Sequence, residues 1–200
     1  SELRSTIFRH LDGIATATSA IALHKKGVLK FLLDNKKVSL EELTTEFKAN
    51  EGYLNVALRV LCSQGWLVQH IDNTSNSVAF KTNANSSKAF SLVPIYKDAV
   101  DLLNYSVKFP EGPIGPDAFL VLERIFTKYE NNFDLKRVEE YSIESQILNH
   151  IEGVIAAPII VMLGVNGLFH KYFMEASFRA QEYHKNPESF KKILDFFYTI

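Results

Sequence analysis

The chain has 200 residues, which suits one or two domains of ordinary size and allows a sizeable core. Hydrophobic residues make up 46% and charged residues 22%, which is typical of a packed globular protein and excludes a largely disordered one. The formal net charge of -1 disfavours non-specific binding to nucleic acid, which needs a basic excess. The single cysteine, Cys62, excludes an intrachain disulfide, and no signal-peptide pattern opens the chain, so we expect a cytoplasmic protein.

The strongest pattern in the sequence is an internal repeat. Residues 10–14, HLDGI, return as residues 150–154, HIEGV, at an offset of 140 (150 minus 10). A second match pairs Asn50 with Asn186 at an offset of 136 (186 minus 50). The last residue given corresponds to Gln64, just before the strands of the first copy. We therefore expect a duplicated fold whose second copy is cut before its wing, with a catalytic domain beyond residue 200.

The first copy opens with a helix-rich segment. Apolar residues three or four positions apart predict a long helix from Leu3 to about Leu23. Gly27 follows three basic residues, which is the expected end of a helix, and a short helix is predicted over 28–33. Val38 is predicted to form a short strand.

A helix-turn-helix arrangement follows. Ser39 and Glu42 have the spacing of a capping box, which predicts a helix over 40–47. Asn50 is expected to cap the next helix, over 51–63.

A hairpin completes the first copy. Residues 66–71 are predicted to form a strand, 72–76 a polar turn, and Val78 with Phe80 a returning strand. The predicted fold class is mainly α with a small β-hairpin, a duplicated winged helix-turn-helix. The first winged-helix domain is assigned to residues 1–87.

A helical connector is predicted over residues 88–141. Pro94 interrupts its first helical stretch, and a loop rich in proline and glycine occupies 109–116, after which Asp117 is expected to cap a helix. Residues 142–200 are assigned to the start of the second winged-helix-like domain. Its apolar run over 153–169 contains Pro and Gly and is interpreted as a buried helix rather than a membrane span.

Few residues suggest chemistry. The six histidines show no metal-binding spacing, and His10 and His150 occupy one repeat position, which favours a structural role over a ligand role. Cys62 lies on the inner stripe of a predicted helix, where a thiol without a basic neighbour is inert. The pairs 41–42 and 139–140 are interpreted as solvated glutamates, and the loop at 112–115 as a rigid connector or, alternatively, the border of a substrate entrance. We assign no catalytic, cofactor-binding or metal-binding residue.

The helix over 51–63 is the one that would read DNA in a winged-helix regulator. Arg59 and Asn55 are its principal groups for bases or phosphates, and one arginine gives little support for such a role. The hairpin tip over 72–76 carries no cation. We therefore expect the fold to be used for packing.

The segments LHKKGVLKFLLDNKKVSLEELTTEF and YLNVALRVLCSQGWL resemble the N-terminal winged-helix region of small-molecule methyltransferases that use S-adenosylmethionine. Leu54, Leu58, Leu61, Gly65 and Trp66 stand at the matching places. The duplication departs from the single copy usual there and looks more like the larger methyltransferases of polyketide synthases.

The resemblance implies that this segment is a non-catalytic lid and scaffold. Methyl transfer to a small or carrier-bound acyl substrate, and binding of S-adenosylmethionine, would take place in a following domain. The implied partners are that substrate and either a second copy of the chain or, within one chain, the other repeat copy; no nucleic acid or membrane is expected. The alternative is a winged-helix regulator or adaptor without catalysis.

Overall fold

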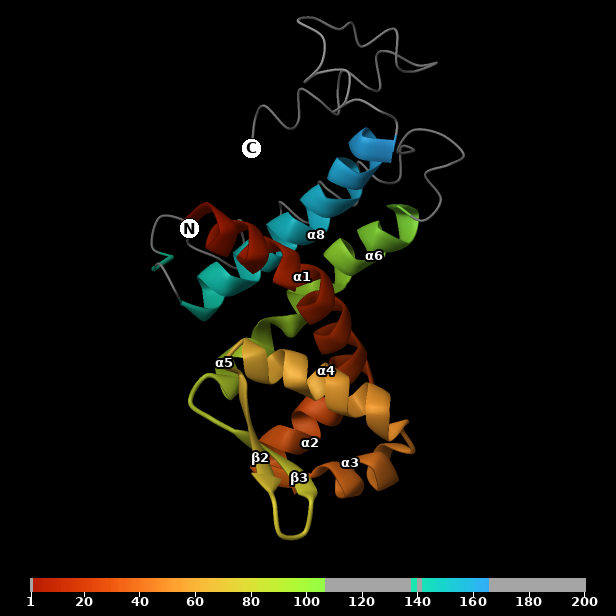
Figure 1. Ribbon diagram of the computed structural model, residues 1–200, viewed down its shortest axis with the longest axis vertical. Helices are drawn as coiled ribbons and strands as arrows, with labels where there is room; N and C mark the ends of the chain where they lie inside the picture. Colours follow the sequence, from red (N-terminus) through yellow and green to blue (C-terminus); the bar gives the residue numbers. More distant parts are fainter. Residues whose placement is uncertain (1, 107–137, 140–141, 166–200) are drawn as a thin grey trace, which may run out of the picture.

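The computed structural model describes residues 2–106, 138–139 and 142–165 of the chain (Figure 1). Helix α1 (Glu2–Lys25) agrees with the predicted long helix and ends on two basic residues, His24 and Lys25, which complement the carbonyl end of a helix. Gly27 adopts the left-handed conformation with φ of 83° and starts helix α2 (Val28–Asn35), so the chain turns sharply between the two helices.

The helix-turn-helix forms at the predicted residues. Helix α3 (Leu40–Phe47) begins at a complete capping box: the Glu42 backbone N–H donates to the Ser39 hydroxyl, and the Glu42 carboxylate accepts from the Ser39 N–H at 2.8 Å. Helix α4 (Glu51–Ser63) is capped by the Asn50 side chain, which accepts from the backbone N–H of Tyr53.

The sheet has three antiparallel strands in the order β1-β3-β2. Strand β1 is Lys37–Ser39, β2 is Leu67–Asp72 and β3 is Ser77–Thr82. The predicted hairpin is thus β2 with β3, and the short predicted strand at Val38 joins it by pairing with Phe80. Three helices followed by such a wing make the first copy a winged helix, as predicted.

The core of this winged helix is formed by the buried apolar side chains of its helices and strands. Trp66 and Phe80 are the largest fully buried side chains from the region of the sheet, and they share one hydrophobic cluster with the leucine stripe of α4. Burial of a large apolar side chain contributes about 2–3 kcal/mol. The side chains that fill the centre are Leu29, Leu32, Leu43, Leu58, Leu61, Trp66 and Phe80.

A helical segment leads away from the wing. Helix α5 (Ser86–Leu92) is followed by a 3₁₀ turn, η1 (Val93–Ile95), and helix α6 (Tyr96–Ser106). Pro94 lies in η1, where its missing N–H costs no helical hydrogen bond, and this explains the predicted interruption. The predicted loop over 109–116 and the helix capped by Asp117 lie outside the described residues.

Helix α8 (Ile143–Val165) is the long helix of the second copy. It begins 141 residues after the start of α1 (143 minus 2), so the two helices keep the offset of the repeat to within one residue. In Figure 1, α8 crosses α1 above the winged helix and α6 lies beside the crossing, and α1 makes its most extensive contact with α8. Within the described residues, no helix is long and apolar enough to cross a membrane.

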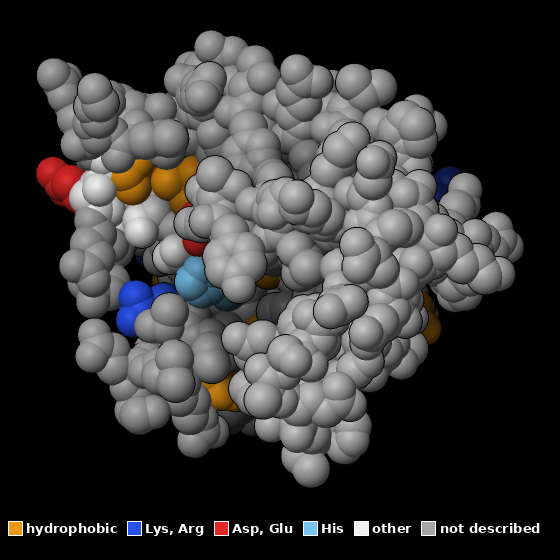
Figure 2. All heavy atoms as spheres, turned by 90° about the horizontal axis from the view of Figure 1, so that it is seen from above, with side chains coloured by type: hydrophobic (Ala, Val, Ile, Leu, Met, Phe, Trp, Pro, Cys, Tyr) orange, Lys and Arg blue, Asp and Glu red, His pale blue; other side chains and the backbone are white. Residues whose placement is uncertain are grey.

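The two halves of α1 differ in burial. Its C-terminal half packs into the winged helix, and Ala17 and Ala20 are fully buried. In its N-terminal half, Leu11 is 45% exposed. Figure 2 shows the molecule from above, with a few hydrophobic side chains and a histidine side chain visible on the same side of the view.

Candidate functional site

The crossing of α1 and α8 is the best-defined feature outside the winged-helix core. A Cβ atom placed on Gly13 would overlap the backbone carbonyl of His150, and one placed on Gly153 would overlap the backbone carbonyl of His10. Each helix therefore uses a glycine to admit the backbone of the other. Small residues allow this close approach, and any side chain at either position would force the helices apart.

The two contacts at the crossing are reciprocal. His10 and His150 occupy one repeat position, and Gly13 and Gly153 occupy another. Each copy therefore supplies one glycine and also the histidine carbonyl that the glycine of the other copy meets. This exchange is the signature of an interface with two-fold symmetry, in which residue i meets j and j meets i. Here it forms between two copies within one chain.

The histidines of the two copies have different surroundings. His10 Nε2 lies 3.0 Å from Glu152 Oε2, and the two side chains are 33% and 53% exposed. His150 is 2% exposed and forms hydrogen bonds through both ring nitrogens. Both histidines have structural contacts of the kind predicted, but only His150 lies in the core.

Helix α8 is fastened to the first copy by a buried polar network around His150. Tyr96 Oη is 2.7 Å from Nδ1, and Gln64 Oε1 is 3.1 Å from Nε2. The neutral tautomer with its proton on Nε2 matches both contacts, because Nε2–H donates to Gln64 and Nδ1 accepts from the Tyr96 hydroxyl. The network joins the end of α4 and the start of α6 to α8.

Burial holds His150 in its neutral form. Desolvation by burial, with a smaller electrostatic contribution from His10, lowers the pKa of His150 from 6.5 to about 4. A protonated ring would have two donors, and the acceptor lone pair that receives the Tyr96 hydroxyl would be lost. His150 is therefore an uncharged structural group at neutral pH.

Two further contacts hold α8 in place. Trp66 Nε1 donates to Gln146 Oε1 at 2.9 Å, so the largest core side chain also satisfies its polar atom on α8. At the surface, Lys88 Nζ forms an ion pair with Glu144 Oε1 at 2.8 Å. The hydrogen bond from Lys88 lowers the pKa of the Glu144 carboxyl.

The outward face of α4 is poorly suited to reading DNA. Tyr53 is 82% exposed and Val56 is 60% exposed on this helix, whereas Asn55, one of the two predicted contact groups, is partly buried. Arg59 is exposed, as a phosphate contact would require. An apolar face with a single arginine lacks the row of donors that base edges and phosphates need.

The tip of the wing is organised around an acid rather than a base. Asp72 Oδ1 accepts from the backbone N–H of Thr74 at 2.8 Å, and Oδ2 accepts from the Ser75 hydroxyl at 2.8 Å. These hydrogen bonds lower the pKa of Asp72, so the carboxylate stays ionised at neutral pH. A negative tip is unfavourable next to a phosphate backbone.

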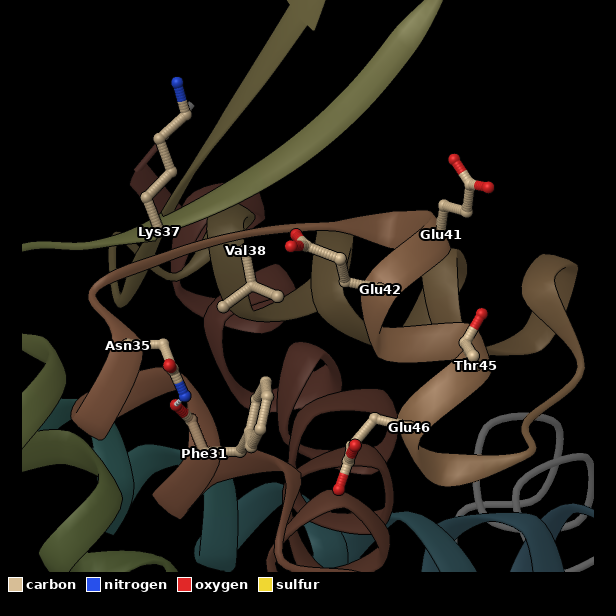
Figure 3. A pocket seen from close by; sticks show the side chains of 8 residues that line it. All are labelled: Phe31, Asn35, Lys37, Val38, Glu41, Glu42, Thr45 and Glu46. Atoms are coloured by element: carbon tan, nitrogen blue, oxygen red, sulfur yellow. Dashed lines mark hydrogen bonds between the residues drawn. The ribbon is translucent and has the colours of Figure 1, made fainter.

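A groove of about 480 Å³ lies between α2, β1 and α3 (Figure 3). Its lining contains three glutamates and one lysine, and in Figure 3 the Lys37 side chain extends away from the other labelled residues. Glu42 is engaged in the capping box, and its hydrogen bonds with Ser39 lower its pKa. The lining residues are Phe31, Asn35, Lys37, Val38, Glu41, Glu42, Thr45 and Glu46. Glutamates around an apolar floor do not by themselves form a binding site.

Cys62 packs against the core on the inner stripe of α4, as predicted, but it is only partly buried. Desolvation raises the pKa of its thiol to about 11, against a smaller opposing effect of Arg59. The thiol is therefore protonated at neutral pH and a poor nucleophile. Among the described residues, no three side chains of His, Cys, Asp or Glu are grouped so that they could hold a metal ion; His170 and His184 lie outside that part.

Comparison with protein families identifies two stretches of the chain. Residues 3–69 match the model of the AprA N-terminal domain, and residues 152–200 match the model of the AprA winged helix domain. Both stretches resemble domains of AprA. Each of the two models covers less than half of the chain. No curated protein and no solved structure matches the chain.

The predicted resemblance to the N-terminal region of small-molecule methyltransferases was wrong as a family assignment, because the matching models are those of AprA. The physical reason lies in the residues that carried it. Leu54, Leu58 and Leu61 form the buried stripe of α4, and Trp66 fills the core. Any winged helix needs this pattern, so it indicates the fold and does not distinguish between families that share it.

The sequence alone did not single out the polar residues that bind His150 and Trp66 at the junction with α8. Gln64 and Gln146 are ordinary polar residues in sequence, and Tyr96 lies in a segment without a motif. One signal was present: Trp66 and a buried tyrosine each need a polar partner, and such partners are often buried amides or histidines.

Proposed function

We propose that this part of the chain is a non-catalytic scaffold in which two winged-helix-type units are held together within one chain at the crossing of α1 and α8. The scaffold provides a fixed base on which other parts of the protein are arranged. One observation carries the proposal, the reciprocal backbone contact at Gly13 and Gly153.

The chemistry of the described residues supports a structural role. The buried histidine is neutral and bonded at both nitrogens, and the cysteine is protonated. These groups stabilise the junction between the copies and lack the activated state that catalysis needs.

The test replaces the glycines by alanine. In Gly13→Ala and in Gly153→Ala the new methyl group meets backbone atoms of the other helix, which cannot rotate away. We expect each variant to lose about 1–3 kcal/mol of unfolding free energy, measured by chemical denaturation. The double variant should lose less than the sum, because the first methyl group already separates the helices at the second site.

The matched control is Gly52→Ala. Gly52 also lies in a helix, α4, but a Cβ atom there would meet only Asn50 Oδ1, at an ordinary contact distance of 3.4 Å. We expect this variant to be neutral or to gain up to about 1 kcal/mol from helix propensity. Equal stability of the Gly13, Gly153 and Gly52 variants would refute the close crossing and the proposal with it.

A winged-helix regulator remains the rival function, and a salt-dependent DNA titration separates the two. A regulator binds DNA at low salt and loses affinity steeply as salt rises. We expect no binding even at low salt, because the face of α4 is apolar and the tip of the wing is acidic.

The predicted enzymatic role and the use of S-adenosylmethionine stay predictions, as does the cytoplasmic location. Isothermal titration of S-adenosylmethionine against the chain extended past residue 200 tests the first two. The prediction places the cofactor in the following domain, so binding by the extended chain and none by residues 1–200 is the expected pair of results.

A further inference from the structure

The N-terminal half of α1 and that of α8 differ in what covers them, although they share a repeat pattern. Ile151 on α8 is fully buried, while its counterpart on α1, Leu11, is 45% exposed. The adjacent side chains, Ile147 and Val154, are also fully buried on α8. Leu11 stands two residues before Gly13, so it points away from the crossing, as Ile151 on α8 does relative to Gly153.

The reciprocal crossing relates these two surfaces. Because each glycine meets the carbonyl of the other copy's histidine, the crossing places the two copies about a local two-fold relation. The N-terminal half of α8 is covered by the first winged helix, through Gln64 and Trp66. Applied to the residues that follow α8, the same relation predicts that the N-terminal half of α1 faces the corresponding part of the second copy.

We propose that the surface around Leu11 is the docking surface for residues 186–200 of this chain. These residues are the repeat counterpart of Asn50–Gln64, and they fall within the stretch that matches a winged helix domain. In the first copy, Gln64 is the last residue of this range, and its side chain contacts His150. The repeat counterparts of Gln64 and His150 are Ile200 and His10, so these two residues should form the corresponding pair. The inference rests on the proposed pairing of the two copies.

The sequence of the occupant suits an apolar surface. Phe190, Leu194 and Phe197 repeat the spacing of the leucine stripe on α4. Where the first copy has the polar Gln64, which satisfies a buried histidine, the second has Ile200. An apolar residue at that point fits a surface that carries Leu11 beside a half-exposed histidine already 3.0 Å from Glu152.

Cross-linking tests the docking in the chain of residues 1–200. In a Cys62→Ala background, His10→Cys with Ile200→Cys is treated with a short bismaleimide, and the products are separated by mass. We expect a cross-link within one chain. The matched control pairs Ile200→Cys with His24→Cys, an exposed histidine near the other end of α1, and should give none. A product of twice the mass, or equal yields for the two pairs, overturns the proposal.

A second measurement does not depend on the cross-linker. In the same background, Leu11→Cys and Val56→Cys report the accessibility of two apolar sites, and both variants are checked for native circular dichroism. If residues 186–200 cover the first site, its thiol should react roughly tenfold more slowly than the second. Equal rates contradict the docking. The glycine variants test only the crossing, so failure here with the glycine result intact would reject this inference alone.

Discussion

Helices α1 and α8 carry the same pattern but have different environments. On α8, the repeat histidine and the following isoleucine are almost completely buried against the first winged helix. On α1, the corresponding histidine forms a partly exposed pair with Glu152, and Leu11 is 45% exposed. The comparison teaches that a repeat preserves the backbone contact, through its glycines, while the side chains around it adapt to different neighbours.

The largest expected difference between the copies is at the histidines. His150→Ala removes the two buried hydrogen bonds to the Tyr96 hydroxyl and the Gln64 amide oxygen and opens a cavity, so we expect a loss of about 3 kcal/mol. His10→Ala removes a partly exposed pair with Glu152 and should cost at most about 1 kcal/mol. Urea denaturation of both variants measures the difference, and equal losses would mean that the two sites are equivalent.

Acid should lower the free energy of unfolding through His150 on α8. The folded pKa of His150, about 4, lies below its unfolded value of 6.5, so the unfolded chain binds the proton more readily. The stability of the folded state is complete above pH 6.5, falls as the pH drops, and has lost this contribution below about pH 4. We expect a loss of about 2 kcal/mol between pH 6.5 and 5.

The control for this pH dependence is His150→Gln, which keeps a polar group but does not titrate. The carboxyl pKa values that the fold lowers are those of Glu42, Asp72 and Glu144, which start from 4.5, 3.8 and 4.5, so these groups titrate at lower pH. Denaturation curves at both pH values should therefore show a flatter response in the variant. An unchanged slope would show that His150 is not the group responsible.

A smaller effect is expected at the second anchor of α8. Trp66→Phe keeps an aromatic ring in the core but removes the N–H that binds Gln146, leaving a partly buried amide oxygen unpaired. We expect a loss of about 1–2 kcal/mol. Gln146→Ala removes the other partner, and a double-mutant cycle between the two changes measures the coupling of α8 to the wing. Additive effects would show that the bond contributes nothing to the junction.

The smallest effect is a gain. Thr16 on α1 is fully buried and its hydroxyl has no hydrogen-bond partner, while the second copy has Ala156 at this position. Thr16→Val keeps the shape of the side chain and removes the unsatisfied group, so we expect about 1 kcal/mol of added stability by thermal unfolding. Thr18→Val is the control, because the Thr18 hydroxyl donates to the Ile14 carbonyl at 2.7 Å. It should not gain.

Local signals predicted most of the first winged helix. The capping box at Ser39, the Asn50 cap and the left-handed Gly27 are set by residues within a few positions of each other, so the sequence contains everything that determines them. The predicted strand over 66–71 differs by one residue from the observed β2, because the Trp66 side chain belongs to the core and its backbone still closes the turn after α4.

The junction between the copies could be predicted only in part. The repeat of residues 10–14 at 150–154 was visible in the sequence, and pairing of the two copies within the chain was one of two predicted arrangements. The network around His150 joins residues that are 54 and 86 positions apart, and no local pattern relates them. The family assignment failed for a related reason, since a buried leucine stripe follows from the geometry of the fold and is shared by unrelated winged helices.

The crossing at Gly13 and Gly153 also has a consequence for dilution. Two separate subunits joined by such a contact would come apart when their concentration fell below the dissociation constant. Two copies linked in one chain meet at an effective concentration that is typically in the millimolar range and does not change with the amount of protein. The duplicated unit thus keeps its pairing at any expression level, and each copy is free to acquire surroundings that its counterpart does not share.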